Sequence, residues 1–108
     1  MIVEMREYTL EAGSVPEYLR IYEQEGLEIQ RSILGQLVGY YSTEVGSAVH
    51  QVVHLWAYES FEDRTERRRQ LAADPGWKAY LKKVRPMFRE QSNRIMNPAP
   101  FFEPELRR

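Results

Sequence analysis

The sequence contains no cysteine, and its only histidines are His50 and His54. The absence of cysteine excludes disulfides, thiolate metal sites and a cysteine nucleophile, although it leaves the redox compartment open. No apolar run approaches the roughly 20 residues that a membrane span needs. The N-terminus also lacks the basic start and apolar run of a secretory signal. We therefore expect a soluble, cytoplasmic protein without a membrane span.

A strong charge of either sign is lacking too, because the 108 residues carry a formal net charge of −1. This balance excludes a general electrostatic attraction to nucleic acid or to an anionic membrane. The basic run Arg64–Arg69 includes Glu66 and extends around most of a helical turn, which is typical of a solvated helix face. Glycine-rich phosphate loops, nucleophile elbows and paired-carboxylate motifs do not occur. We therefore expect no nucleic-acid partner.

The most informative stretch that is present is Val49–Tyr58, which is rich in β-branched and aromatic residues and free of glycine and proline. This composition predicts a strand. One face would carry Val49, Gln51, Val53, Leu55 and Ala57. The other face would carry His50, Val52, His54, Trp56 and Tyr58. A strand without a solvated face belongs in the middle of a sheet.

Local patterns predict the remaining elements in chain order. In the first half they are a strand over Ile2–Thr9, a helix from a capping box at Ser14 and Glu17 to about Leu34, a strand over Gln36–Val45 and a turn at Gly46–Ala48. In the second half they are a helix capped at Ser60 and ending near Ala73, a helix that restarts at Asp74 and Pro75, and a short strand over Asn93–Met96. Pro86 should bend this last helix or end its regular part.

This order predicts an α+β fold, the ferredoxin-like βαββαβ arrangement, with an antiparallel four-stranded sheet and helices on one face. Residues 1–97 would form the single domain and residues 98–108 an extended C-terminal tail. We expect Val3, Met5, Val53 and Leu55 to face the helices. The opposite face would then hold Arg6, Tyr8, His54, Trp56 and Tyr58. An apolar face left uncovered predicts a homodimer formed by packing two sheet faces across a two-fold axis.

Several separated motifs resemble the NIPSNAP domain. They are Glu4-Met-Arg-Glu-Tyr8, His54-Leu-Trp-Ala-Tyr58, the run from Arg67 to Trp77, Asn93-Arg-Ile-Met, and Pro98-Ala-Pro-Phe101. The resemblance covers nearly the whole chain and implies a dimeric α+β barrel, in which two ferredoxin-like protomers close the sheets. It implies no settled activity, although animal members are associated with mitochondria and vesicle traffic. Related barrels of other families include cofactor-free monooxygenases and haem-degrading enzymes, which is an analogy of fold only.

Arg6, Tyr8, His54, Trp56 and Tyr58 are the candidate ligand-binding residues, because they combine a cation, phenols, an imidazole and a flat apolar ring. Arg6 suits a carboxylate or phosphate. His54 is the candidate catalytic residue, since an ordinary histidine pKa of about 6.5 allows proton transfer at neutral pH. The structural alternative is that Arg6 pairs with Glu4 while His54 and Trp56 only fill the interior.

A metal site is not expected, because His50 and His54 would lie roughly 13 Å apart along a strand and zinc–nitrogen bonds are about 2 Å long. No cofactor is expected either. Three functions remain open: a homodimeric barrel that binds a small acidic or aromatic molecule, a cofactor-independent enzyme (monooxygenase-like or proton-transfer) that uses His54, and a scaffold that binds another protein.

Overall fold

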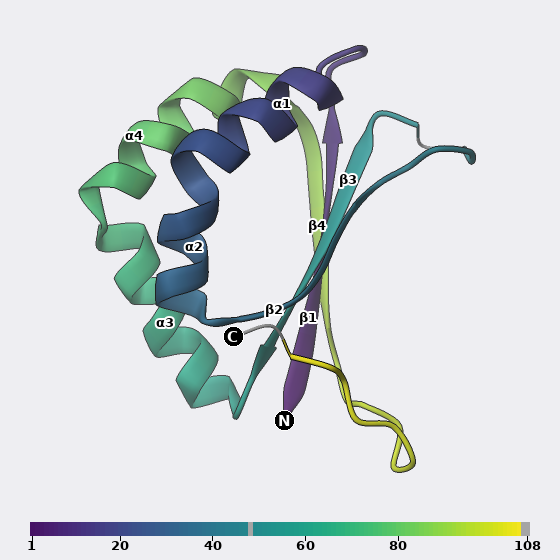
Figure 1. Cartoon of the computed structure of the whole chain (residues 1–108), viewed down its shortest axis with the longest axis vertical. Helices are drawn as coiled ribbons and strands as arrows, with labels where there is room; N and C mark the ends of the chain where they lie inside the picture. The colour runs from purple at the N-terminus through teal and green to yellow at the C-terminus, as the bar shows by residue number, and fades with distance from the viewer. Residues whose placement is uncertain (48, 107–108) are drawn as a thin grey trace.

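The computed structural model describes residues 1–47 and 49–106. Its elements in chain order are β1 (Ile2–Leu10), α1 (Val15–Ile21), the π-helical segment η1 (Tyr22–Gly26), α2 (Leu27–Leu34), β2 (Gln36–Ser42), β3 (Gln51–Tyr58), α3 (Phe61–Ala73), α4 (Pro75–Val84), the 3₁₀ turn η2 (Arg85–Met87) and β4 (Phe88–Met96). The strands form one antiparallel sheet in the order β2-β3-β1-β4. All helices lie on the same face of this sheet (Figure 1). The predicted ferredoxin-like α+β fold is confirmed.

β1 and β3 occupy the middle of the sheet and set the positions of the polar groups beneath the helices. Their register pairs Glu4 with Trp56 and Arg6 with His54. Because side chains alternate between the two faces of a strand, directly paired residues point to the same side. Arg6 and His54 therefore lie next to each other on one face, with Glu4 and Trp56 beside them.

The predicted orientation of this face is wrong. His54, Trp56 and Tyr58 lie beneath the helices and are almost completely buried. Val53 and Leu55, which we expected to face the helices, lie on the open side and are half-buried. The reason is physical: large rings remove the most apolar area from water, so they stabilise the fold most where two layers meet.

Two of the three predicted helix caps form. The Ser60 hydroxyl accepts a hydrogen bond from the Asp63 amide, and the Asp74 carboxylate accepts one from the Trp77 amide. Ser14 precedes α1, but its side chain makes no capping hydrogen bond, so the predicted capping box there is wrong. Ser14 has helix-like backbone angles, φ −85° and ψ −10°, rather than the extended angles of Ser60. A capping hydroxyl normally needs the extended conformation to reach the N2 or N3 amide.

The first long helix is one continuous element, but its middle is a π-helical segment. A Cβ on Gly26 would lie 3.0 Å from Tyr22 and 3.1 Å from Tyr80. The absence of a side chain therefore lets α4 approach the first helix closely. α4 ends at Val84 and Pro86 falls in the following 3₁₀ turn, as the sequence predicted.

The sheet strands differ in length from the sequence prediction. β4 begins at Phe88 rather than Asn93, because it continues antiparallel to β1 along nearly its whole length. β2 ends at Ser42, and β3 begins at Gln51, so the connection between them is longer than a tight turn. The predicted turn at Gly46–Ala48 falls in this connection, and Ala48 lies outside the described residues.

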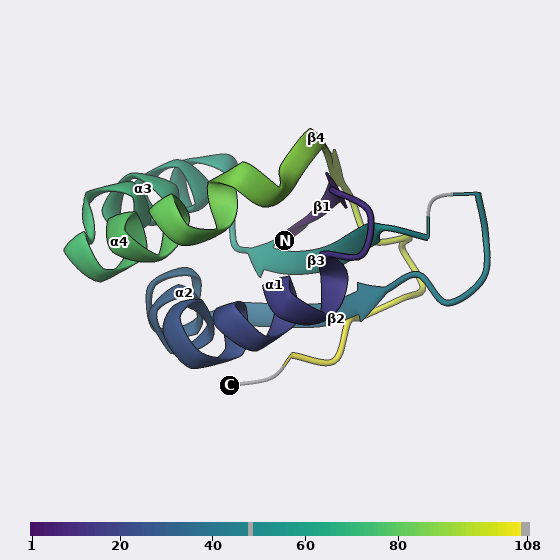
Figure 2. The ribbon, with the colours of Figure 1, turned by 90° about the horizontal axis from the view of Figure 1, so that it is seen from above.

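Residues 98–106 of the predicted tail contain no helix or strand, and one turn is closed by a hydrogen bond from the Phe102 amide to the Ala99 carbonyl. Seen from above, this segment runs past the side of the sheet that bears no helix (Figure 2). Arg107 and Arg108 lie outside the described residues. Within the parts of the chain that the structure describes, no helix is long and apolar enough to cross a membrane.

Candidate functional site

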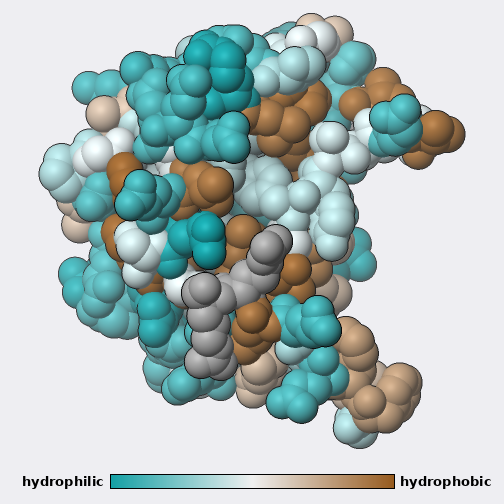
Figure 3. All heavy atoms as spheres, viewed as in Figure 1, coloured by the Kyte–Doolittle hydropathy of each residue, from teal (hydrophilic) through white to brown (hydrophobic). Residues whose placement is uncertain are grey.

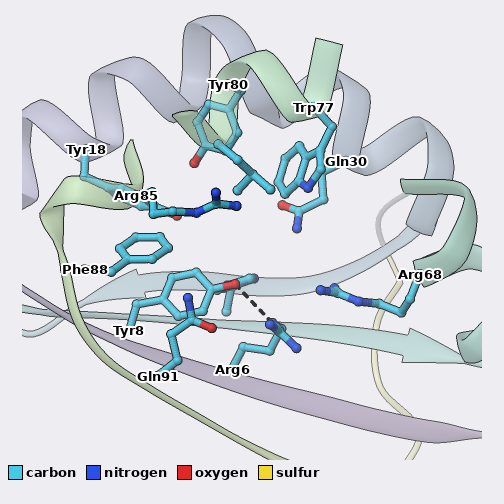
Figure 4. A pocket seen from close by; sticks show the side chains of 12 residues that line it. Arg6, Tyr8, Tyr18, Gln30, Arg68, Trp77, Tyr80, Arg85, Phe88 and Gln91 are labelled. Carbon is cyan, nitrogen blue, oxygen red and sulfur yellow. Dashed lines mark hydrogen bonds between the residues drawn. The ribbon is translucent and has the colours of Figure 1, made fainter. Parts of the chain in front are cut away.

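A cavity of about 400 Å³ lies between the helix-covered face of the sheet and the helices (Figure 4). β1, β3 and β4 supply its floor, and α1, α2, α3 and α4 with η2 supply its walls. The lining residues are Arg6, Tyr8, Tyr18, Gln30, His54, Arg68, Trp77, Tyr80, Leu81, Arg85, Phe88 and Gln91. The volume falls in the range of about 300–1,000 Å³ that is typical of small-molecule sites.

The lining of the cavity is strongly cationic. It includes three arginines, Arg6, Arg68 and Arg85, and no aspartate or glutamate. Arg6 is paired, since its Nη1 lies 3.0 Å from Glu4 Oε2 and its Nε donates to the Tyr8 hydroxyl at 3.0 Å. Neither Arg68 nor Arg85 forms an ion pair with any residue that the structure describes. Their guanidinium groups point into the cavity (Figure 4). Two uncompensated cations therefore face it.

Glu4 is fully buried beside this cavity and fixes Arg6. Its carboxylate accepts hydrogen bonds from Arg6, from both Nε and Nη2 of Arg64, and from the Asn93 amide, at 2.7–3.0 Å. Burial alone would raise the pKa of Glu4, but hydrogen bonds from Arg64 and Asn93 and the charges of Arg6 and Arg64 outweigh it and lower the pKa to about 2. Because Glu4 stays ionised, it ties β1 to α3 and β4 and holds Arg6 in place.

His54 is held by three rings. The Trp56 indole Nε1–H donates to His54 Nδ1 at 2.7 Å. Tyr40 stacks on the imidazole with 4.7 Å between the ring centroids, and Tyr8 contacts it edge-on with 4.9 Å between the centroids. Burial lowers the pKa of His54 to about 3, with help from the positive charges of Arg6 and Arg68. The expected pKa near 6.5 is therefore wrong, and His54 is neutral at physiological pH.

The predicted site residues divide into two groups. Arg6, Tyr8 and His54 line the cavity together, on the helix side of the sheet. Trp56 and Tyr58 are buried beyond its lining, where Trp56 contacts His54 rather than the cavity. The alternative in which Arg6 pairs with Glu4 also holds. The pairing and the place in the cavity are therefore compatible.

Sequence reasoning missed the helical half of the site. The sequence pattern placed Arg68 in a solvated basic run, and it gave Trp77 no role in a site. Arg85 and Gln30 were not singled out at all. Which helical residues meet the sheet depends on how the helices pack, and no local pattern contains that information.

Aromatic side chains make up much of the remaining wall. The Tyr18 and Tyr40 hydroxyls lie 2.9 Å apart, and the Tyr22 hydroxyl donates to Gln30 at 2.6 Å. Burial raises the pKa of Tyr18 to about 12, so this phenol remains protonated at neutral pH. No group of three or more histidine, aspartate or glutamate side chains among the described residues is placed to hold a metal ion. The described lining thus offers neutral donors, rings and arginines.

The chain is similar in sequence and structure to known proteins. The NIPSNAP family model matches residues 3–103. The chain is similar to human Protein NipSnap homolog 3A, with 38% identity over 74 residues, which are 68% of this chain and 29% of that protein. It is similar to Drosophila melanogaster Protein NipSnap, with 29% identity over 93% of this chain and 36% of that protein. The chain therefore spans about a third of the length of these relatives.

Solved structures of NIPSNAP family proteins are similar to this chain over nearly its whole length. A NIPSNAP family protein with unknown function from Agrobacterium tumefaciens shares 46% identity at a TM-score of 0.93, over 97% of this chain and 94% of that chain. A NIPSNAP-like domain protein from Burkholderia xenovorans shares 43% identity at a TM-score of 0.92, over 95% and 89% of the two chains. A putative antibiotic biosynthesis monooxygenase from Nitrosomonas europaea, at 10% identity and a TM-score of 0.67 over 90% and 97%, shows likeness of fold alone. The chain belongs to the NIPSNAP family.

Proposed function

We propose that this NIPSNAP domain binds a small aromatic anion in the cavity between its sheet and its helices. The observation that carries the proposal is the unbalanced charge of the lining, which has three arginines and no carboxylate. Glu4 neutralises Arg6 from behind, which leaves Arg68 and Arg85 for a ligand. Arginine suits this task because its planar guanidinium binds carboxylates and phosphates through two parallel hydrogen bonds.

The aromatic part of the ligand is argued from the walls. Tyr8, Tyr18, Trp77, Tyr80 and Phe88 all line the cavity. Rings of this kind bind other flat rings through offset or edge-on contacts, and each such contact contributes about 0.5–1.5 kcal/mol beyond the area it buries. A ligand that combines one or two fused rings with an acidic group would satisfy both kinds of lining residue.

A pair of nearly isosteric probes tests this proposal. Isothermal titration calorimetry would compare 2-naphthoate with the neutral 2-naphthamide. We expect the acid alone to bind, and Arg68→Gln to weaken binding about tenfold to a hundredfold, since a hydrogen bond to a charged group contributes about 1.5–3 kcal/mol. Arg69→Gln is the matched control, because Arg69 follows Arg68 on α3 but is exposed and paired with Glu66.

Equal binding of the acid and the amide would refute the anionic part of the proposal. An equal loss of affinity in Arg68→Gln and Arg69→Gln would show that net charge matters rather than the cavity. A failure of both probes to bind the unaltered protein would refute the aromatic-anion site as a whole.

We also propose that two copies pack through the open sheet face. Met5, Val53 and Leu55 lie on this face, and Tyr41 at its β2 edge is 61% exposed. Further exposed apolar side chains are Val45 in the β2–β3 connection and Phe101 and Phe102 in the tail turn. In Figure 3, hydrophobic surface is visible at both projecting ends on the right of the molecule. Apolar side chains left exposed on a sheet face favour an interface, and a two-fold axis is the simplest way to cover them.

Leu55→Lys tests the dimer, because it places a charge in the middle of the proposed interface. Sedimentation equilibrium should show the unaltered protein as a dimer and the variant as a folded monomer. Ala79→Lys is the matched control, since Ala79 is exposed on α4 on the opposite side of the molecule. A monomeric unaltered protein at micromolar concentration would refute the proposal.

The enzyme alternative assigned proton transfer to His54. That role stays a prediction, but a pKa near 3 leaves the imidazole without a transferable second proton at neutral pH. No carboxylate in the described lining takes its place as a base. The cytoplasmic location also stays a prediction from the sequence.

A further inference from the structure

His54 carries a buried hydrogen-bond donor with no partner. Indole nitrogen only donates, so the 2.7 Å contact with Trp56 requires His54 Nδ1 to be the acceptor. A neutral imidazole has one proton, which must then sit on Nε2. That nitrogen is buried and forms no hydrogen bond with any described residue. An unpaired buried donor destabilises the fold, so its presence at a cavity points to a missing acceptor.

Arg68 presents a second buried donor of the same kind. Its Nη1 is buried and without a hydrogen-bond partner among the residues described. Arg68 and His54 line the same cavity from opposite layers, α3 and β3. The charge of Arg68 also contributes to the low pKa of His54. Arg68 also lies close to the Tyr58 hydroxyl, which is itself buried without a hydrogen-bond partner among the described residues. The cavity lining therefore holds two unsatisfied N–H groups, a neutral one on His54 and a cationic one on Arg68.

We propose that His54 is a specificity-determining hydrogen-bond donor, locked as the Nε2–H tautomer by Trp56, and that it seats an anionic oxygen of the ligand together with Arg68. The ligand class is an aromatic carboxylate, whose oxygens accept from these groups. Trp56 is a positioning residue, since it acts through His54 without lining the cavity. This inference rests on the proposed binding function. It also predicts the orientation of the ligand, whose acidic group would point inward towards β3.

The groups around His54 keep it neutral. Its neighbours are Arg6 and Tyr8 on β1, Tyr40 on β2, Tyr18 on α1 and Arg68 on α3. Among the described residues, Glu4 is the acid that acts on it. Glu4 is already bound by two arginines and an asparagine. A second proton on His54 would also destroy the bond from Trp56, because both nitrogens would then be donors. Its role as a donor is therefore independent of pH in the neutral range.

Two-dimensional ¹H–¹⁵N spectra of the imidazole in the ligand-free protein test directly whether Trp56 fixes the tautomer of His54. We expect His54 as the Nε2–H tautomer, without titration between pH 5 and 8. Trp56→Phe keeps a ring but removes the indole N–H, and should yield a mixture of tautomers. Phe61→Leu alters an exposed ring at the start of α3, outside the cavity lining, and should leave the His54 signals unchanged. An Nδ1–H tautomer, or a titration near pH 6.5, would overturn the proposal.

Calorimetry with 2-naphthoate tests the donor. We expect His54→Leu to weaken binding at least tenfold, and His54→Gln, whose amide can donate, to retain part of the affinity. Trp56→Phe should weaken binding several-fold, and the unaltered protein should bind equally at pH 5.5 and 8. If the unaltered protein binds and His54→Leu binds as tightly, this inference alone falls. If the unaltered protein does not bind, the binding function falls and the inference falls with it.

Discussion

Glu4 gives the sharpest stability prediction, because a single buried carboxylate receives all the donors that join three elements. Two oxygens accept from Arg6, Arg64 and Asn93, so an amide nitrogen in place of either oxygen would meet a donor. Breaking a buried ion pair on one side typically costs about 3–5 kcal/mol. We expect Glu4→Gln to lower the free energy of unfolding by about that amount at pH 7, as measured by urea denaturation.

The pH dependence provides an independent measure of the same network. The pKa of Glu4 falls from 4.5 to about 2 on folding. At about 1.4 kcal/mol for each pKa unit, this corresponds to about 3 kcal/mol. Because the folded pKa is lowered, that stability is present above pH 4.5 and is lost as the pH falls towards 2. We expect the free energy of unfolding of the unaltered protein to decline through this window, and the decline to be much smaller in Glu4→Gln.

Glu66→Gln is the control for this loss of stability at low pH, which we call the acid limb. The pKa of Glu66 is also lowered to about 2, by hydrogen bonds from Arg69 and Gln70, but the side chain is on the solvent side of α3. Exposed pairs contribute little, so its curve should follow that of the unaltered protein. The same acid limb in Glu4→Gln and in the unaltered protein would refute the reasoning. If Glu4→Gln does not fold, Asn93→Ala, which removes one donor, should lower stability and raise the midpoint of the acid limb.

Three further predictions concern local structure. Ser60→Ala should lower the free energy of unfolding by about 1 kcal/mol, whereas Ser14→Ala should have almost no effect, because only Ser60 caps its helix; urea denaturation of the two variants would show the difference. Gly26→Ala should destabilise by about 1–3 kcal/mol despite its better helix propensity, since the new methyl group meets Tyr22 and Tyr80; a gain in melting temperature would contradict this. Leu34→Ala should cost about 2–5 kcal/mol, because Leu34 is fully buried at the end of α2, and thermal melts would measure it.

Much of the fold follows from local patterns. The run Val49–Tyr58 predicted a central strand, the caps at Ser60 and Asp74 predicted two helix starts, and Pro86 predicted the end of α4. These features are encoded within a few residues of where they act, through side-chain alternation, capping and the missing proline amide. The element order alone then gave the ferredoxin-like arrangement.

The sequence also brought Arg6, Tyr8 and His54 onto one face, because a strand places every second residue on the same side. It did not determine which face the helices cover. Both faces of β3 are apolar enough to be buried, and the choice depends on which set of side chains packs against Tyr18, Trp77 and Tyr80. Only the tertiary structure decided which face the helices cover. It also decided that Arg68 and Arg85 lie close to the sheet residues of the cavity, and that Trp56 fixes the position of the proton on His54. These contacts join residues from separate elements, so their geometry arises from packing rather than from spacing along the chain.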